Sequence, residues 1–273
     1  MTTKIIEITK PRVRNPIFIE GLPGVGNVGR IAGGYLVEEL NAKKFAELYS
    51  SHFMPFVLLQ QGATVHVLKN EFYYWKAKTA KQRDLIILIG DSQSIDAVGH
   101  YDVVDKILDY VATFKVKDIF TLAGLSVGEK KEKPGVVGAV SDHSLVKKYS
   151  KYGIDFESGE NVGTIMGASG LIIGMGKMRG MDGVCLLGET SGMPLLPDPK
   201  ASEEVLKVLT KILGIRLDTS KIKEKVKEME KLIKRVETIQ RKAILDLMKQ
   251  RLPKPGKEEE EGEEEGEELT YIG

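Results

Sequence analysis

The feature that most restricts the fold is an alternation of continuous apolar runs with segments of helical periodicity. Three runs are apolar at nearly every position: residues 84–90, 118–123 and 183–188. Strands of this kind are buried on both faces, as in a parallel sheet that is covered by helices. The chain has 273 residues, of which 42% are hydrophobic, enough to bury a sizeable core. The sequence therefore predicts an α/β fold with a largely parallel sheet flanked by helices.

The remaining segments extend this plan. Residues 63–68 and 71–78 both alternate between apolar and polar side chains, and we expect them to pair as a hairpin that turns at Lys69 and Asn70. Further strands are expected at 17–19, 45–49, 56–59 and 136–140, and helices at 28–40, 101–114, 144–152, 163–180 and 201–213. We expect an α/β core over residues 1–215, a long C-terminal helix over 216–252 and an acidic tail over 253–273.

The long helix carries a stripe of apolar residues with coiled-coil spacing. Intervals of 4-3-4-3 separate Ile222, Val226, Met229, Ile233 and Val236. A helix from about Thr219 to Gln250 is roughly 45 Å long at 1.5 Å per residue, which exceeds what a domain of this size covers. The stripe is therefore expected to contact a second copy of the chain, although a helix docked on its own domain is the alternative.

The last seventeen residues combine an acidic run with an apolar tip. Nine of the twelve residues from Lys257 to Glu268 are glutamate, and such a block of like charge is expected to stay solvated and disordered. Leu269, Tyr271, Ile272 and Gly273 follow it, and we interpret them as a short partner-binding peptide on a tether. A tail that only improves solubility is the alternative.

Charge and composition exclude several classes of function. Residues 1–256 hold 39 basic and 30 acidic residues, a net charge of +9, and many of the cations lie in 221–251. Acidic residues interrupt that basic stretch and aromatic residues are absent from it, so it is a poor nucleic-acid binder. No apolar run reaches the length of a membrane span, and the N-terminus lacks a signal-peptide pattern. The single cysteine, Cys185, is expected to be buried. We expect a cytoplasmic protein.

A glycine loop follows the first core strand. Gly24, Gly26 and Gly29 form a G-x-G-x-x-G pattern between a strand and a helix, which in a dinucleotide-binding fold lets the backbone approach a pyrophosphate. The acid that would hold the ribose is in doubt, because Glu47 falls in the middle of its predicted strand. A Walker loop is excluded, since Asn27 and Val28 stand where Lys and Ser or Thr are required. Structural glycines in a tight turn are the favoured interpretation, and a nucleotide- or phosphate-binding enzyme that uses Gly21–Gly29 is the alternative.

Three other strand ends carry small polar residues. Residues 90–93 and 188–192 are possible rims of a pocket, and 124–128 matches a G-x-S-x-G pattern that leads into a Lys/Glu loop rather than a helix. The four histidines lack metal-ligand spacing. We therefore expect no catalytic set, no metal and no cofactor.

Together, the glycine block 20–29, the Gly-Asp-Ser strand end at 90–92 and the blocks 187–194 and 197–199 resemble archaeal members of the proteasome-assembly-chaperone family, of the PbaA/PbaB type. The resemblance covers about residues 10–215. It implies a nucleoside-phosphorylase-like α/β domain without enzymatic activity, self-assembly into rings of four or five subunits, and contact with the proteasome α-ring or a related archaeal complex.

The family's tail motif places a hydrophobic residue before a penultimate tyrosine, and this sequence departs from it. Tyr271 is third from the end, and Thr270 precedes it. The expected function is a non-enzymatic, homo-oligomeric chaperone or adaptor that docks on the proteasome α-ring, or on another complex, through its tail.

Overall fold

The fold comes from a computed structural model. The structure describes residues 2–128, 131–160, 163–192 and 197–219, together with Lys221, Ile222 and Glu224. All of them belong to one compact unit, residues 1–237. The oligomerisation candidates Val226, Met229, Ile233 and Val236 and the tail candidates Leu269, Tyr271, Ile272 and Gly273 lie outside the described residues.

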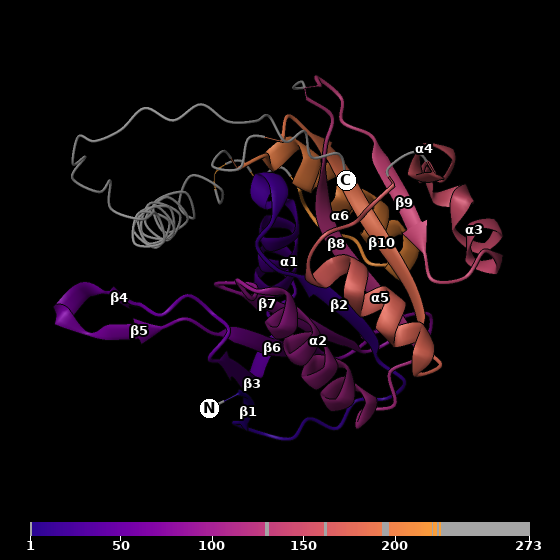
Figure 1. The fold of residues 1–273 in the computed structure, drawn as a ribbon. Coiled ribbons are helices and arrows are strands. Elements are labelled where there is room, and N and C mark those ends of the chain that lie inside the picture. Colours follow the sequence, from indigo (N-terminus) through magenta and orange to yellow (C-terminus); the bar gives the residue numbers. More distant parts are fainter. Residues whose placement is uncertain are drawn as a thin grey trace, which may run out of the picture. The chain divides into compact units, whose positions relative to one another are not determined.

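Strands and helices alternate along most of the described chain (Figure 1). The strands are β1 (Thr3–Glu7), β2 (Ile17–Gly21), β3 (Lys43–Ser50), β4 (Val57–Leu59), β5 (Val65–Val67), β6 (Asn70–Trp75), β7 (Leu85–Gly90), β8 (Asp118–Ser126), β9 (Val136–Val140) and β10 (Asp182–Thr190). The α-helices are α1 (Val28–Glu39), α2 (Ala97–Ala112), α3 (Ser144–Tyr149), α4 (Glu157–Glu160), α5 (Ala168–Met178) and α6 (Pro199–Leu213).

Within the described ranges, eight strands form one mixed sheet in the order β1-β3-β6-β7-β2-β8-β10-β9. Its centre, β7-β2-β8-β10, is parallel. The flanking strands β1, β3 and β6 on one side and β9 on the other pair antiparallel. The expected α/β fold is confirmed, and the three continuous apolar runs are the parallel strands β7, β8 and β10.

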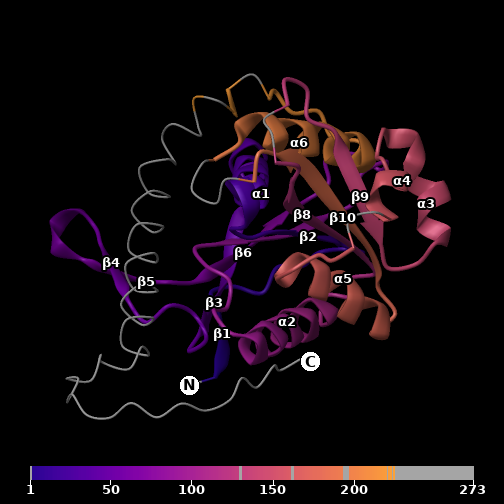
Figure 2. The ribbon, with the colours of Figure 1, turned by 45° about the horizontal axis from the view of Figure 1, so that its top comes forward.

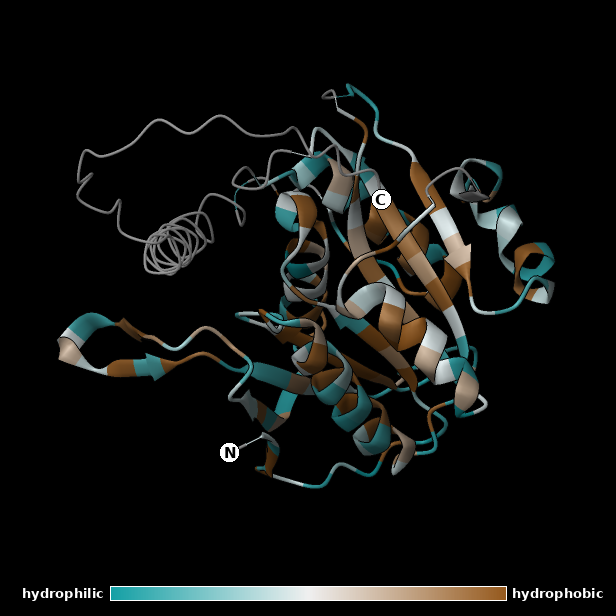
Figure 3. Cartoon of the chain, viewed as in Figure 1, coloured by the Kyte–Doolittle hydropathy of each residue, from teal (hydrophilic) through white to brown (hydrophobic). Residues whose placement is uncertain are grey.

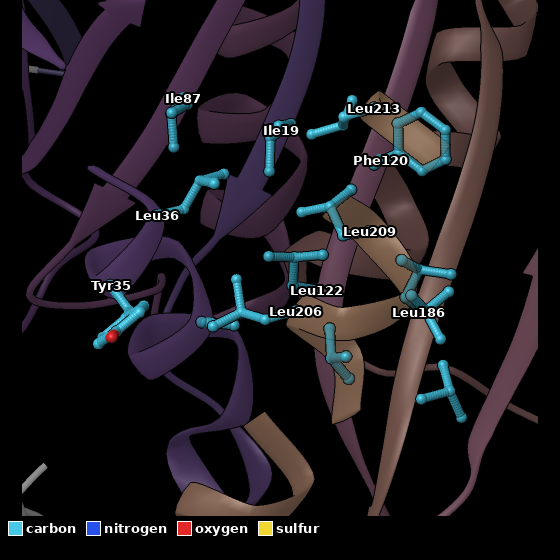
Figure 4. Packing of buried hydrophobic residues seen from close by; sticks show 14 of the residues in the cluster. Ile19, Tyr35, Leu36, Ile87, Phe120, Leu122, Leu186, Leu206, Leu209 and Leu213 are labelled. Atoms are coloured by element: carbon cyan, nitrogen blue, oxygen red, sulfur yellow. The ribbon is translucent and has the colours of Figure 1, made fainter. Parts of the chain in front are cut away.

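Helices cover both faces of the sheet. Figure 2 shows α1 and α6 on one face and α2 and α5 on the other. The core between the sheet and α1 and α6 is built from aliphatic side chains, among them Ile19, Leu36, Leu122, Leu186 and Leu206, all at most 1% exposed (Figure 4). Each such side chain contributes about 1.5–3 kcal/mol by leaving water. The parallel strands are therefore clamped between two apolar layers, and this fixes the positions of the loops at their ends.

The expected hairpin between 63–68 and 71–78 is wrong. Strand β5 pairs instead with β4, with Val57 opposite Val67 and Leu59 opposite Val65. Strand β6 joins the main sheet between β3 and β7. The turn that closes the real hairpin contains Gly62 and Ala63, whose φ angles are 75° and 56°. Alternation reveals amphipathic strands, but it does not say which neighbour pairs with which.

The start of the predicted long helix enters the same core. Ile222 is 1% exposed and packs with the residues of α1 and α6. Tyr35 of α1 donates a hydrogen bond to the carbonyl of Asp218 just before it. The side chain of Ile222 is thus covered by its own chain, so any contact with a second copy would fall to the other four residues of the stripe. None of the helices in the described part of the chain is long and apolar enough to cross a membrane.

Candidate functional site

Four loops meet at the carboxyl edge of the parallel strands, where α/β proteins place their sites. They are residues 21–29 after β2, 90–93 after β7, 124–128 at the end of β8 and 188–192 at the end of β10. The sequence singled out all four, and the sheet order brings them side by side. Their contacts decide whether this edge holds a ligand.

The glycine loop is folded on itself. Gly26 has a φ of 59°, in the left-handed region that favours glycine, and Asn27 follows with a φ of 49°. The amide of Asn27 donates to the carbonyl of Gly24 at 2.9 Å. The carbonyl of Gly26 accepts from the amide of Asp198, whose side chain caps the start of α6. The loop therefore uses the carbonyls of Gly24 and Gly26 and the amide of Asn27 within the protein.

The glycines of this edge serve close approaches between elements. A Cβ atom on Gly29 would lie 2.1 Å from the carbonyl oxygen of Leu122, so α1 rests directly on the backbone of β8. A Cβ on Gly124 would lie 2.2 Å from the carbonyl oxygen of Val25, and one on Gly26 would lie 2.9 Å from the hydroxyl of Thr190. These contacts account for Gly26, Gly29 and Gly124 by packing, which favours the structural interpretation, whereas a Cβ on Gly24 would meet only Nε2 of Gln93 at 3.8 Å.

Two side chains tie the loop to the start of α5. Gln93 donates to the carbonyl of Pro23 at 2.6 Å and accepts from the amide of Ala168 at 2.8 Å. Glu20 accepts from the amide of Leu22 and from the hydroxyl of Ser169, both at 2.9 Å. The loop ends are thus joined by hydrogen bonds between segments about 70 to 150 residues apart in the sequence.

Glu20 is the residue of this edge that the sequence analysis missed. It is fully buried at the end of β2, and burial raises its pKa to about 7, although its two hydrogen bonds act in the opposite direction. Its signal in the sequence is weak: one carboxylate directly after the apolar run Ile17–Ile19. The carboxyl group of Glu20, directly before the glycine loop, therefore changes charge near neutral pH.

The dinucleotide interpretation requires an acid at the end of a strand next to β2. Glu47 lies instead in β3, which β6 and β7 separate from β2. Its oxygens accept from Lys44 at 2.7 Å and from Lys69 at 2.6 Å. Burial opposes its ionisation, but hydrogen bonds from Lys44, Lys69 and Tyr49 prevail and lower its pKa to about 2. Glu47 therefore belongs to an ionic cluster of the antiparallel strands and not to the glycine loop.

Asp91, directly after β7, joins three elements. One oxygen lies 3.4 Å from the guanidinium of Arg30 in α1, and the other lies 2.6 Å from Nε2 of His66 in β5 and accepts from the amide of Lys69. A hollow of about 270 Å³ lies among these residues. The carboxylate fixes the base of the β4–β5 hairpin against the domain.

No nucleophile elbow is formed at the G-x-S-x-G pattern. Ser126 is the last residue of β8, where it pairs with Thr190, and the chain continues toward β9 rather than into a helix. Cys185 is buried as expected, and burial raises its pKa to about 12. In the part of the chain that the structure describes, no group of three His, Cys, Asp or Glu side chains is placed to hold a metal ion.

The β4–β5 hairpin, residues 57–67, extends away from the main sheet, and we call it the arm (Figure 1). Figure 3 colours much of both strands as hydrophobic, and the pairing of Val57 with Val67 and of Leu59 with Val65 places these four side chains on one face, the outer face. Val57, Leu59, Val65 and Val67 are 44%, 70%, 64% and 52% exposed. On the inner face, Leu58 is 5% exposed and lies opposite His66. Such a cluster of exposed aliphatic side chains is typical of a surface that contacts another protein.

Comparison with known proteins identifies relatives along almost the whole chain. The crystal structure of Pyrococcus furiosus PbaB, described as an archaeal proteasome activator, is 43% identical, with 86% of this chain and 99% of that chain covered and a TM-score of 0.77. Pyrococcus furiosus PbaA, described as an archaeal homolog of proteasome-assembly chaperone, is 27% identical, with 88% and 98% covered and a TM-score of 0.70.

A curated relative, an uncharacterized protein of Methanocaldococcus jannaschii, is 31% identical over 273 residues, which is all of this chain and 97% of the relative. The family model described as PAC2 matches residues 18–237, from the second residue of β2 to beyond the described core. The resemblance drawn from the glycine block and the strand ends is thereby confirmed. This chain belongs to the PAC2 family.

Proposed function

We propose that this chain is a cytoplasmic, non-enzymatic and homo-oligomeric adaptor or assembly chaperone that acts on the proteasome. The observation that carries the proposal is the 43% identity that extends over 99% of a chain described as an archaeal proteasome activator. A shared fold alone would say little, because one fold hosts many functions. Identity at this level over the full chain supports a shared partner as well.

The hydrogen bonds between the loops of the carboxyl edge support a role without chemistry. Gln93, Glu20 and Thr190 bind or cover the loops at the place where an α/β enzyme would admit its substrate. In the glycine loop, the amide of Asn27 donates to the carbonyl of Gly24, and the carbonyl of Gly26 accepts from the amide of Asp198. In the described chain, the exposed aliphatic face of the arm suits a contact with another protein instead.

For the contact with the proteasome α-ring, or with a related archaeal protein, we propose the tip formed by Leu269, Tyr271, Ile272 and Gly273. The apolar side chains of Leu269 and Tyr271 supply the contact, and the acidic tether lets the tip search for its pocket. The five residues after Glu268 bury little area, so a single tail binds weakly. Several tails on one oligomer gain affinity through effective concentration.

Removal of the tip is expected to weaken binding to an archaeal proteasome core particle by at least about tenfold, because tyrosine anchors commonly contribute more than 1 kcal/mol. A surface-binding assay would compare the intact protein, a truncation after Glu268, Tyr271→Ala and the control Thr270→Ala, which keeps the aromatic ring. If the truncation and Tyr271→Ala bind as well as the parent, the tail is not the docking element.

We also propose self-association, in four or five subunits as the family resemblance implies. The apolar stripe of the C-terminal helix supports it, and so does the outer face of the arm, where four aliphatic side chains stand in solvent. Burial of such surface contributes about 25 cal/mol per Å². The two surfaces are independent, so each can be tested alone.

Ile233→Glu and Leu59→Glu are each expected to shift the protein toward smaller species, because each places a charge in a proposed apolar contact. Light scattering at micromolar concentration would measure the mass. Thr238→Glu adds the same charge outside the stripe and should leave the mass unchanged. A parent that is a monodisperse monomer would contradict self-association, and unchanged mass in both variants would remove these two surfaces from the proposal.

A further inference from the structure

A second concave surface lies at the amino edge of the parallel strands, opposite the glycine loop. It is a hollow of about 720 Å³, within the range of about 300–1,000 Å³ that is usual for ligand sites. Residues 12–15, which precede β2, form one side of it, and residues 76–84, which connect β6 to β7, form the other. We call it the basic hollow because of the charges described next.

Four cationic side chains line the basic hollow: Arg12, Arg14, Lys76 and Arg83. The first three are exposed, and no ion pair joins them to a carboxylate of the described residues. The one lining carboxylate, Asp84, accepts from the backbone amides of Arg14 at 2.7 Å and Ala77 at 2.8 Å. Its oxygens are therefore engaged by the backbone and form no ion pair with the three cations, so one carboxylate stands against four cations in the lining.

The side chain of Arg83 lines the hollow and is held in place by two partners. Its guanidinium lies 2.5 Å from a carboxylate oxygen of Asp118, and its Nε donates to the carbonyl of Asn15 at 2.9 Å. The contact with Asn15 holds the segment before β7 against the segment before β2, and the contact with Asp118 joins it to the start of β8. Arg83 is thus fixed by these contacts, while Arg12, Arg14 and Lys76 are exposed.

Not every hollow on the domain has this charge imbalance. Between β1 and α2, a hollow of about 580 Å³ is lined by Lys4 and Lys106 but also by Glu7 and Asp109. Its cations and carboxylates are equal in number. Only an anionic partner would gain from the basic hollow, whereas the β1–α2 hollow has no preference of that kind.

The same chain contains a segment of the complementary chemistry. Nine glutamates stand in residues 257–268. The chain also leaves α6 beside the basic hollow, since Gln82, one of its lining residues, donates to the carbonyl of Gly214 at 3.0 Å. We propose that the basic hollow binds the acidic segment 257–268 of this protein.

The chemistry fits a weak and reversible contact. Several carboxylates in sequence can each approach one of Arg12, Arg14 and Lys76, and an exposed pair contributes about 0–1 kcal/mol. Tethering raises the effective concentration, and salt lowers the attraction because exposed charges are screened over about 8 Å at physiological ionic strength. The inference goes beyond the proposed function: it concerns the acidic segment rather than the tip, and binding of that segment restrains the tip.

Zero-length carbodiimide cross-linking of the full chain tests this proposal, because it joins a lysine to a carboxylate only when the two are in contact. Peptide mass mapping should find the glutamates of 257–268 joined mainly to Lys76 in the lining of the basic hollow and to Lys78 and Lys81 in the same segment 76–84. The double variant Arg12→Glu/Arg14→Glu should lower the yield of these cross-links about tenfold, since attraction becomes repulsion. One molar salt should have a similar effect.

The matched control is Lys4→Glu/Lys106→Glu, which makes the same charge change at the β1–α2 hollow and should leave the cross-links intact. Cross-links spread evenly over surface lysines, or concentrated on the lysines of 221–251, would overturn the proposal. So would an unchanged yield in Arg12→Glu/Arg14→Glu. Proteasome binding by these variants is a separate measurement, so the failure of this inference and the failure of the proposed function can be distinguished.

Discussion

Gly29→Ala is expected to lower the free energy of unfolding by about 3–5 kcal/mol, at the upper end of single substitutions. The added Cβ would lie 2.1 Å from the carbonyl oxygen of Leu122 and 3.0 Å from that of Leu22. Both obstacles are backbone atoms in the centre of the fold, so the strain cannot be relieved by a side-chain rotation. Helix α1 would have to move off β8 and open the aliphatic core between them.

Urea unfolding followed by circular dichroism would measure this loss. Gly174→Ala is the matched control, because Gly174 is an exposed glycine within α5 and its Cβ position has no neighbour within 4 Å. That control should be more stable than the parent by about 0.5–1 kcal/mol, from helix propensity. If Gly29→Ala unfolds within 1 kcal/mol of the parent, the close approach of α1 to β8 is not a constraint on the fold.

Glu20→Gln is expected to stabilise the protein at alkaline pH and to do so less at acid pH. The pKa of Glu20 is about 7 in the folded protein against an ordinary value of 4.5 for a glutamate side chain, so folding favours the protonated form. The stability that depends on this proton is fully present below pH 4.5 and is lost as the pH rises through 7. The loss amounts to about 3 kcal/mol, at 1.36 kcal/mol for each pKa unit.

Glutamine keeps the shape and cannot ionise. Its carbonyl can accept from the amide of Leu22, and its amide can donate to the hydroxyl of Ser169. The difference in unfolding free energy between variant and parent should therefore grow from pH 4.5 to about pH 8 and then level off. Glu157→Gln makes the same chemical change at an exposed position and should show no such growth. A difference that does not change with pH would contradict the buried, titrating state of Glu20.

The positions of the helices and parallel strands could be predicted because they follow from periodicity in the sequence. Strand 136–140 and helix 201–213 agree with β9 and α6 within two residues. Strand pairing could not be predicted, because β5 and β6 are both amphipathic and their partners depend on the turn at Gly62 and on the sheet edge offered by β7. Short strand β1 carries too little apolar pattern to be recognised.

At the carboxyl edge, the sequence indicated the right loops but not their contacts. Gln93 and Ser169 lie 70 and 149 residues from the groups that they bind in the glycine loop and at the end of β2, so no local pattern connects them. The aliphatic residues of the arm were predicted to be a strand, but alternation says only that two faces differ. Whether the apolar face is buried depends on which other elements of the fold pack against it.

The separation of the arm from the main sheet has a consequence for how this surface can change during evolution. An isolated pair of strands is marginally stable in water, so the arm depends on Leu58 and His66 at its base for its own folding. The central sheet and its two apolar layers do not in turn depend on Val57, Leu59, Val65 or Val67. Substitutions at these four positions can therefore alter partner choice without moving the rest of the chain toward its unfolding threshold.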